Sequence, residues 1–537
     1  MKANKFFLGL ALIGAILTGC ETGQGPETNG DEAKAYMSVR ISMASTAGSR
    51  ASDAGFEAGT TAEQTINVGN SIFLFYDEDG NWVTSGQLAT GDAVYEDGDC
   101  DVATLSNTGA YIVLSGPDVE LQKSEQVLTV VNFNGVDKLK QLNLNEALLE
   151  VANSTDNKAD GTTCGFLMST SVYYDKALDD ANNKLYPNGI VNTTAIDASK
   201  NICQTATAAK DNPVVIHIER ASAKAQLSTA SGDYLLTGDK QVVVDGVLSD
   251  VTVAINGWTL NNVHETTYLV KRLQEGWATS APFTTWNWTE GRRSYWAEGC
   301  NWGKLTNAGN TVYAYENATL LPDGTASMYC YENTVNQPKC AKGEPTPNVN
   351  TVLIAAQFKV GTEDYQNLYE YAGVFYREGT YKALLVKQLN DAKYRKNDAE
   401  LTASDITIDT VGTTLAGVKI ILADGSYTVN GAPSSKADAD TYINATSYVD
   451  ETKGYAMGKC FYQIPVEHLG AVGTSAEYGM VRNHVYKISI KSVNHVGEPV
   501  YDPTVDIPEI PAQTIEHYLA AEIHVLDWHV VEQSVDL

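Results

Sequence analysis

The chain has 537 residues, of which 43% are hydrophobic, so it can build more than one folded core. Acidic residues outnumber basic ones, 66 against 37, and the formal net charge is −29. A surface of this sign disfavours nucleic acid and anionic membranes as partners. No apolar segment is long enough to span a bilayer, so membrane contact is expected only through a lipid.

The beginning of the chain has the features of a lipoprotein signal peptide. A short basic stretch precedes an apolar run, 6–17, which is too short for a transmembrane helix. A small residue then comes directly before Cys20. The pattern predicts a signal peptide over 1–19 and lipidation of Cys20. The alternative is an ordinary secretory signal with an incidental cysteine.

A first strand is predicted at 36–43, because apolar and polar residues alternate there. Its apolar face contains Met37, Val39, Ile41 and Met43. The stretch that follows is rich in small residues and contains Arg50 directly before Ala51. A cut between these two residues would detach the strand together with its lipid. Residues 20–50 are therefore predicted to be a lipidated propeptide with a removable strand.

Short apolar runs bounded by turn residues make up most of the remaining chain, and few segments, among them 145–152 and 382–390, suggest helices. This pattern is typical of an all-β fold built from β-sandwiches. One strand, 214–220, runs directly into another. A boundary here predicts an N-terminal β-sandwich over 51–220 and a C-terminal one over 221–497.

The remainder, 498–537, is expected to be a proline-rich arm that ends in a strand. Pro499, Pro503, Pro508 and Pro511 oppose regular pairing, so this part should be extended. Apolar residues alternate again beyond them, with a slip at 526–527 that suggests a β-bulge. The predicted buried face of this terminal strand consists of Ala521, Ile523, Val525, Trp528 and Val530.

A removable strand near one end and an isolated strand at the other suggest how copies could join. Loss of 36–43 would leave an apolar groove with an unpaired edge, which is a template for the strand of another chain. If about four side chains are buried at roughly 1.5–3 kcal/mol each, the exchange involves on the order of 6–12 kcal/mol. The alternatives are that the first strand never leaves, that Arg50 is an ordinary solvated arginine, and that the terminal strand pairs within its own subunit.

In this order the features resemble a fimbrillin of the type V pili of Bacteroidia, closest to the shaft subunit of the minor fimbria. Further parts of the resemblance are Ile218-Glu219-Arg220-Ala221, Arg293-Ser294-Tyr295-Trp296-Ala297, Val481-Arg482-Asn483-His484-Val485-Tyr486 and Val525-Leu526-Asp527-Trp528.

The resemblance implies two transthyretin-like β-sandwich domains, an outer-membrane lipoprotein precursor, cleavage by a trypsin-like, arginine-specific protease, and polymerisation through the C-terminal strand into a surface fimbria. The expected partners are other copies, accessory and anchor subunits, the protease, the lipid-modification machinery and a host glycan or protein receptor.

The sequence contains no recognisable catalytic set, metal site or cofactor motif. The eight histidines show no HxxH or HExxH spacing, and no serine lies in a GxSxG motif, so we expect neither an enzyme nor a bound cofactor or metal. Among the eight cysteines, Cys330 and Cys340 are near enough in sequence to close a short disulfide loop. At least one other cysteine should be a free, buried thiol.

Two other functions remain open. Tryptophans gather between 277 and 302 and could form a sugar-binding platform, although such aromatic side chains more often fill space between loops. That reading describes a monomeric, surface glycan-binding lipoprotein. The other is an anchor or tip subunit of the same fimbria. The presence of both Arg50-Ala51 and a terminal strand favours a shaft subunit that supports adhesion.

Overall fold

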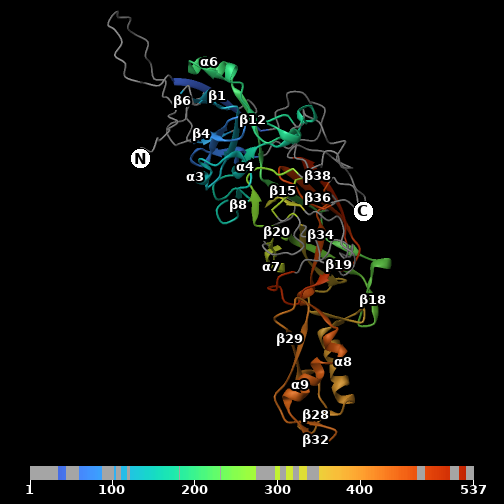
Figure 1. Cartoon of the computed structure of the whole chain (residues 1–537). Coiled ribbons are helices and arrows are strands. Elements are labelled where there is room, and N and C mark those ends of the chain that lie inside the picture. The colour runs from blue at the N-terminus through green and yellow to red at the C-terminus, as the bar shows by residue number, and fades with distance from the viewer. Residues whose placement is uncertain are drawn as a thin grey trace, which may run out of the picture.

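Figure 1 shows a computed structural model of the chain, which describes residues 34–43, 60–87, 102–104, 110–117, 121–180, 182–229, 232–273, 297–300, 302, 310–318, 326–334, 350–468, 478–507 and 519–527. Strands dominate this part of the chain, and its longest helix has 14 residues. The prediction of an all-β fold with few short helices is confirmed. Within these ranges, no helix has both the length and the apolar character needed to cross a membrane.

The N-terminal part is organised around one nine-stranded sheet with the order β13-β1-β14-β9-β7-β3-β4, in which β6 also pairs with β1 and β12 with β7. The strands are β1 (Lys34–Met43), β3 (Ile72–Tyr76), β4 (Trp82–Gln87), β6 (Ala110–Pro117), β7 (Gln126–Val131), β9 (Met168–Thr170), β12 (Thr194–Ala195), β13 (Ile202–Cys203) and β14 (Val214–Arg220). Short helices connect them: α1 (Thr61–Gln64), α3 (Val136–Leu139), α4 (Leu144–Ala147), α5 (Ala198–Asn201) and α6 (Ala206–Asp211). The helix suggested at 145–152 is thus much shorter, and a strand, β8 (Val151–Asn153), follows it.

The central strands of this sheet are buried on both faces, which explains their continuous apolar sequences. Every residue of β3 is buried, with Phe73 and Phe75 packing into one core and Ile72, Leu74 and Tyr76 into another. The second core also contains Leu269, Tyr331 and Val481, which come from later in the chain. The two halves of the molecule therefore share apolar packing.

The largest sheets of the C-terminal part are three sheets of four or five strands, with the orders β23-β15-β36-β38, β16-β19-β25-β34-β37 and β18-β17-β27-β26-β33. Their strands are β15 (Ser222–Ser228), β16 (Tyr234–Leu236), β17 (Val242–Val244), β18 (Val247–Ser249), β19 (Val251–Asn261), β23 (Ser327–Tyr331), β25 (Thr351–Val360), β26 (Leu368–Tyr371), β27 (Val374–Arg377), β33 (Lys453–Tyr455), β34 (Lys459–Pro465), β36 (His484–Val493), β37 (Glu498–Pro499) and β38 (Leu519–Asp527). A large core around Trp258, Phe358 and Tyr486 lies between these sheets. β14 and β15 follow one another in the chain but lie in different sheets.

Residues 378–452, between β27 and β33, form a distal module at the end of the molecule opposite β1 (Figure 1). It contains α8 (Glu378–Asp391), β28 (Tyr394–Lys396), β29 (Ile406–Thr410), β30 (Val418–Leu422), β31 (Tyr427–Val429), β32 (Ala432–Ser434), α9 (Lys436–Asn444) and α10 (Ser447–Asp450). The helix suggested at 382–390 is present as α8, which buries Tyr381, Leu385 and Leu389 in the core of the module.

Candidate functional site

β1, the strand predicted to be removable, has a neighbour along both of its edges. It runs antiparallel to β6 from Lys34 opposite Pro117 to Ile41 opposite Ala110. On its other side it pairs briefly with β13 and then runs parallel to β14, where Met43 lies opposite Ile218. Removal of β1 would therefore open a slot between β6 and β14 rather than trim the edge of the sheet.

The apolar side chains of β1 whose environment is described are completely buried. Met37 and Val39 belong to the core that also contains Phe73, Phe75 and Ile216. Ser38, between them, is buried too, and α6 contacts β1. Ile41 and Met43 lie opposite Ile216 and Ile218 of β14.

The two halves of the molecule repeat one arrangement of four strands. In the N-terminal half, β6, β1, β14 and β9 are neighbours with antiparallel, parallel and antiparallel pairing. In the C-terminal half, β23, β15, β36 and β38 are neighbours with antiparallel, parallel and antiparallel pairing in the same order. The terminal strand β38 thus takes the position that β9 has in the first half.

β38 pairs with β36 of its own chain (Figure 1), which is the alternative that the sequence left open. In this register Ala521, Ile523 and Val525 stand opposite Ile490, Ile488 and Tyr486 respectively. These β36 side chains are buried, so the predicted alternation is in phase with theirs. The register is regular from Val525 to Asp527, and the one irregularity lies between Ile490 and Ser492. The bulge expected at 526–527 is therefore absent from the described part of β38.

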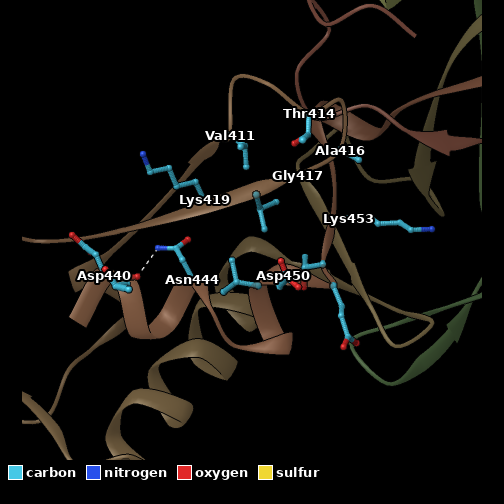
Figure 2. Close-up of a pocket in the computed structure, with 14 residues that line it drawn as sticks. Val411, Thr414, Ala416, Gly417, Lys419, Asp440, Asn444, Asp450 and Lys453 are labelled. Carbon is cyan, nitrogen blue, oxygen red and sulfur yellow. Dashed lines mark hydrogen bonds between the residues drawn. The ribbon is translucent and has the colours of Figure 1, made fainter. Parts of the chain in front are cut away.

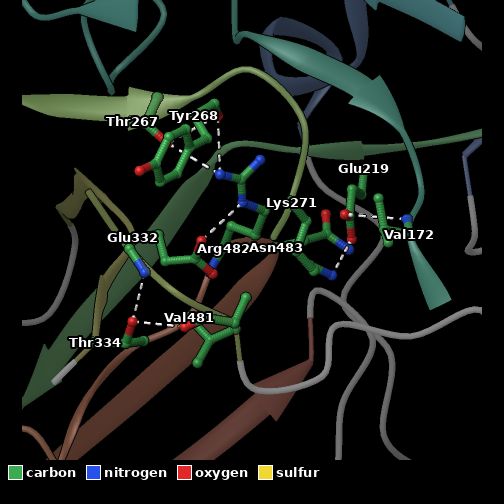
Figure 3. A network of polar contacts seen from close by, with 12 residues as sticks. Val172, Glu219, Thr267, Tyr268, Lys271, Glu332, Thr334, Val481, Arg482 and Asn483 are labelled. Atoms are coloured by element: carbon green, nitrogen blue, oxygen red, sulfur yellow. Dashed lines mark hydrogen bonds and ion pairs between the residues drawn. The ribbon is translucent and has the colours of Figure 1, made fainter. Parts of the chain in front are cut away.

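A network of buried charges joins the halves where β14 ends and β36 begins (Figure 3). Lys271 Nζ lies 2.5 Å from Glu219 Oε2, and the two side chains are 0% and 1% exposed. Arg482 Nε lies 3.2 Å from Glu332 Oε2, and this pair is equally buried. Buried ion pairs are stable only when further hydrogen bonds satisfy both partners.

Arg482 meets this requirement through β21 (Thr266–Tyr268) and the residue that follows it. Its guanidinium donates to the carbonyl oxygens of Leu269, at 3.3 Å, and Tyr268, at 2.9 Å, and to the hydroxyl of Thr267, at 3.1 Å (Figure 3). Burial raises the pKa of the Glu219 carboxyl, while the charges of Lys271 and Arg482 oppose this rise. The network fixes the orientation of the two halves with interactions that tolerate little displacement.

The sequence predicted the segment around Glu219 as a strand at the domain boundary and identified the segment around Arg482 only as part of a resemblance, and it gave neither charge a role. It missed Lys271 and Glu332 altogether. The signal available was a charged residue inside or beside an apolar strand, which indicates a buried partner without identifying it.

Several predicted sites lie outside the described residues, namely Cys20, Arg50, Ala51, Cys340, Trp528, Val530 and the tryptophans at 277, 286, 288 and 296. Trp302 packs against the second core of the N-terminal half. Cys330 is a free, buried thiol with its sulfur 3.4 Å from Met480 Sδ. The expected free, buried thiols are confirmed by Cys164 and Cys460. In the described ranges, no three His, Cys, Asp or Glu side chains are grouped to hold a metal ion.

The distal module contains a pocket of about 880 Å³ between the 411–419 segment and the helices α9 and α10 (Figure 2). Its lining is polar and aliphatic, with Val411, Val418 and Val449 beside Thr414, Thr441 and Asp450, and contains no aromatic side chain. Asn444 is already used, because its side-chain amide bonds the N–H and the C=O of Ile420 on β30. The pocket therefore lacks the aromatic platform that sugar stacking needs.

We expect Lys271→Met to lower the free energy of unfolding by about 3–5 kcal/mol near pH 7, because the buried Glu219 carboxylate then loses its ion-pair partner. The pKa of Glu219 is raised in the folded state, so the folded protein holds the proton more tightly than the unfolded chain does. The loss should therefore be small below the usual carboxyl pKa and should grow as the pH rises. Denaturant unfolding between pH 4 and pH 8 measures it.

The matched control for this prediction is Lys387→Met, which removes the exposed pair with Asp391 on α8. Exposed pairs contribute little, so no measurable change is expected. Equal losses for both variants, or a loss at Lys271 that does not vary with pH, would contradict the assignment.

One region of the chain matches a known protein family. Residues 453–534 match the family described as major fimbrial subunit protein type IV, fimbrillin, C-terminal. This stretch runs from β33 past the end of β38 and includes β36. No curated protein matches the chain.

Three of the solved structures that the chain matches come from Parabacteroides distasonis and Porphyromonas gingivalis. A candidate cell adhesion protein from Parabacteroides distasonis is 11% identical over 94% of this chain and 99% of its own, with a TM-score of 0.38. The tip fimbrial protein Mfa3 from Porphyromonas gingivalis, with a C-terminal truncation, is 10% identical over 92% and 100%, with a TM-score of 0.34. A fimbrial assembly protein from Parabacteroides distasonis is 13% identical over 61% and 82%, with a TM-score of 0.26.

Identities near one tenth and TM-scores below 0.5 leave the match at residues 453–534 as the basis for assigning the chain. That match covers the strand pair β36 and β38, which the structure places at the end of the second half. Residues 453–534 match the C-terminal region of the fimbrillins, and over this stretch the resemblance to a fimbrillin seen in the sequence is confirmed.

Proposed function

We propose that the whole chain is a fimbrillin and the structural shaft subunit of a surface fimbria, exported as an outer-membrane lipoprotein, cleaved after Arg50 and polymerised by strand exchange. Its role is structural and adhesive rather than catalytic. The observation that supports this most is the position of β1, a buried strand between β6 and β14 that precedes the rest of the fold in the chain.

The two ends of the segment 44–59, which contains Arg50, are attached close to each other. Met43 lies opposite Ile218 of β14, and two residues further along that strand Arg220 Nε donates to the carbonyl oxygen of Glu63 at 2.9 Å. The segment is much longer than a tight turn between these points requires. A cut after Arg50 would separate β1 from the body without moving either attachment.

Strand exchange would improve the pairing of β38. Among the described strands of its own subunit, β38 is the last strand of its sheet and pairs with β36 alone, whereas a strand in the slot of β1 has partners on both edges. Each additional backbone hydrogen bond contributes about 0.5–1.5 kcal/mol. The terminal strand of one copy therefore gains by entering the slot of the next, once that slot is empty.

Cys20→Ala should abolish lipid attachment, because it removes the thiol that would be acylated. Membrane association should be lost as well, since the acyl chains supply the only expected membrane anchor and each buried CH₂ contributes about 0.8 kcal/mol. Labelled palmitate should enter the wild-type precursor and not the variant. Equal labelling of both would show that the lipid is attached elsewhere.

Arg50→Ala should keep β1 in place and prevent filament growth, because the slot stays occupied. Wild-type protein treated with an arginine-specific protease should form filaments visible by electron microscopy, with Ala51 as the first residue on N-terminal sequencing. Filaments that begin at Cys20 in most copies would rule out the opening step. A monomer after complete cutting would favour an anchored, glycan-binding protein.

A cysteine pair can test which chain supplies the strand in the slot. Val525→Cys, combined in turn with Val214→Cys, Ile216→Cys or Ile218→Cys, should give ladders of cross-linked subunits after cutting, because disulfides need Cα atoms about 4.4–6.8 Å apart. The matched control, Ile488→Cys with Ile523→Cys, joins register partners and should cross-link within single chains of the uncut protein. If every pair cross-linked only within single chains after cutting, polymerisation by strand exchange would be contradicted.

A further inference from the structure

The first helix after the predicted cut, α1, is attached to the C-terminal half by a buried ion pair. Glu63 Oε1 lies 3.0 Å from Lys224 Nζ of β15, and the side chains are 1% and 3% exposed. The same oxygen accepts a hydrogen bond from the Tyr329 hydroxyl of β23 at 2.5 Å. The second oxygen, Oε2, accepts from the backbone N–H of Thr60 at 2.5 Å. Both oxygens of the buried carboxylate therefore have donors, as a stable buried charge requires.

The residues after α1 are held by the N-terminal half in the same way. Asn132, fully buried, accepts from the N–H of Asn67 at 2.5 Å and donates to the carbonyl oxygen of Thr65 at 2.8 Å. Ile66, between them, is buried in the core that β1 also helps to form. Residues 60–67 are thus bonded to both halves of the molecule, and none of the hydrogen bonds and ion pairs named here involves β1.

A comparison within the chain shows that the burial of Glu63 is not needed to cap a short helix. α4 has a capping box of the same kind, in which Glu146 Oε2 accepts from the N–H of Asn143 at 2.9 Å. Glu146 remains exposed, and α4 is as short as α1. Taking a carboxylate out of water costs several kcal/mol unless it is paired, so the burial of Glu63 calls for a different explanation.

We infer that the Glu63–Lys224 pair ties residues 60–67 to the domain junction after the propeptide has left, so that the cut releases β1 and nothing that follows it. This inference rests on the proposed function and adds to it how the processed N-terminus is retained. Without such a tie, removal of β1 would leave α1 as a frayed end beside an open core, because four-residue helices are not stable alone.

The charge state of Glu63 agrees with this role. Burial alone would raise the pKa of its carboxyl, but the hydrogen bonds from Tyr329 and Thr60 and the charge of Lys224 outweigh it, so the pKa is lowered. A lowered pKa in the folded state means that the tie contributes fully above the usual carboxyl pKa and is lost only as the pH falls below it. The Glu63 carboxylate therefore stays charged at neutral pH.

Hydrogen exchange of residues 60–67, before and after treatment with an arginine-specific protease, tests the tie. In the wild type, the protection of these amides should be unchanged by the cut. In Glu63→Gln the cut should lower it by tenfold or more, because the lysine is left buried without its carboxylate. Glu146→Gln, the matched control, should leave it unchanged.

Two further variants keep the test decisive if Glu63→Gln folds poorly. Tyr329→Phe removes one hydrogen bond and should give a smaller loss, and Glu63→Gln combined with Lys224→Met should recover part of the protection, since neither charge then remains. Loss of protection in the cut wild type, equal effects of Glu63→Gln and Glu146→Gln, or no recovery in the double variant would each overturn the tie.

Electron microscopy of the same samples separates the tie from the proposed function. Filaments of cut protein in which residues 60–67 have lost protection would overturn the tie and leave the polymer intact. Protected residues 60–67 in a cut protein that never forms filaments would support the tie and remove the shaft role.

Discussion

The structure depends on the rule that the backbone of every strand inside a sheet needs partners along both edges. β1 meets this rule between β6 and β14, two strands that lie about one hundred residues apart in the chain. A strand in such a place cannot leave without exposing two rows of hydrogen-bonding groups and the apolar core beneath them. This makes β1 costly to remove and would make an empty slot strongly selective for another strand, which is how the proposed cut would direct assembly.

In the proposed assembly, the junction between the halves has the opposite requirement, since it must not change when β1 leaves. Two buried ion pairs cross it, Lys271 with Glu219 and Lys224 with Glu63, in addition to apolar contacts. Apolar packing tolerates sliding, whereas a buried charge that loses its partner is strongly destabilising. The pairs therefore select one relative orientation of the halves, and the strand exchange proposed above operates on a rigid body.

Alternation of apolar residues was enough to predict the fold class, the strand at 36–43 and the terminal strand, because a period of two is a local property of the sequence. The partner of the terminal strand was not predictable in this way. Ile523 fits beside Ile488 of its own chain, and the same alternation would fit the slot of β1 in another. Lys271 pairs with a residue 52 positions away, and no local pattern specifies which acid a buried lysine meets. The prediction of a bulge at 526–527 is wrong, because a change in the alternation of apolar residues does not require a change in the register of backbone pairing.

The direct connection of β14 to β15 has a mechanical consequence for a filament under tension. A strand seated beside β14 would load that ladder along its length, and Ala221 passes the load covalently to β15. β15 lies parallel to β36, and the chain continues from β36 into the arm that would reach the next subunit. Pulling on such a filament would strain two ladders in shear, with all of their hydrogen bonds resisting together.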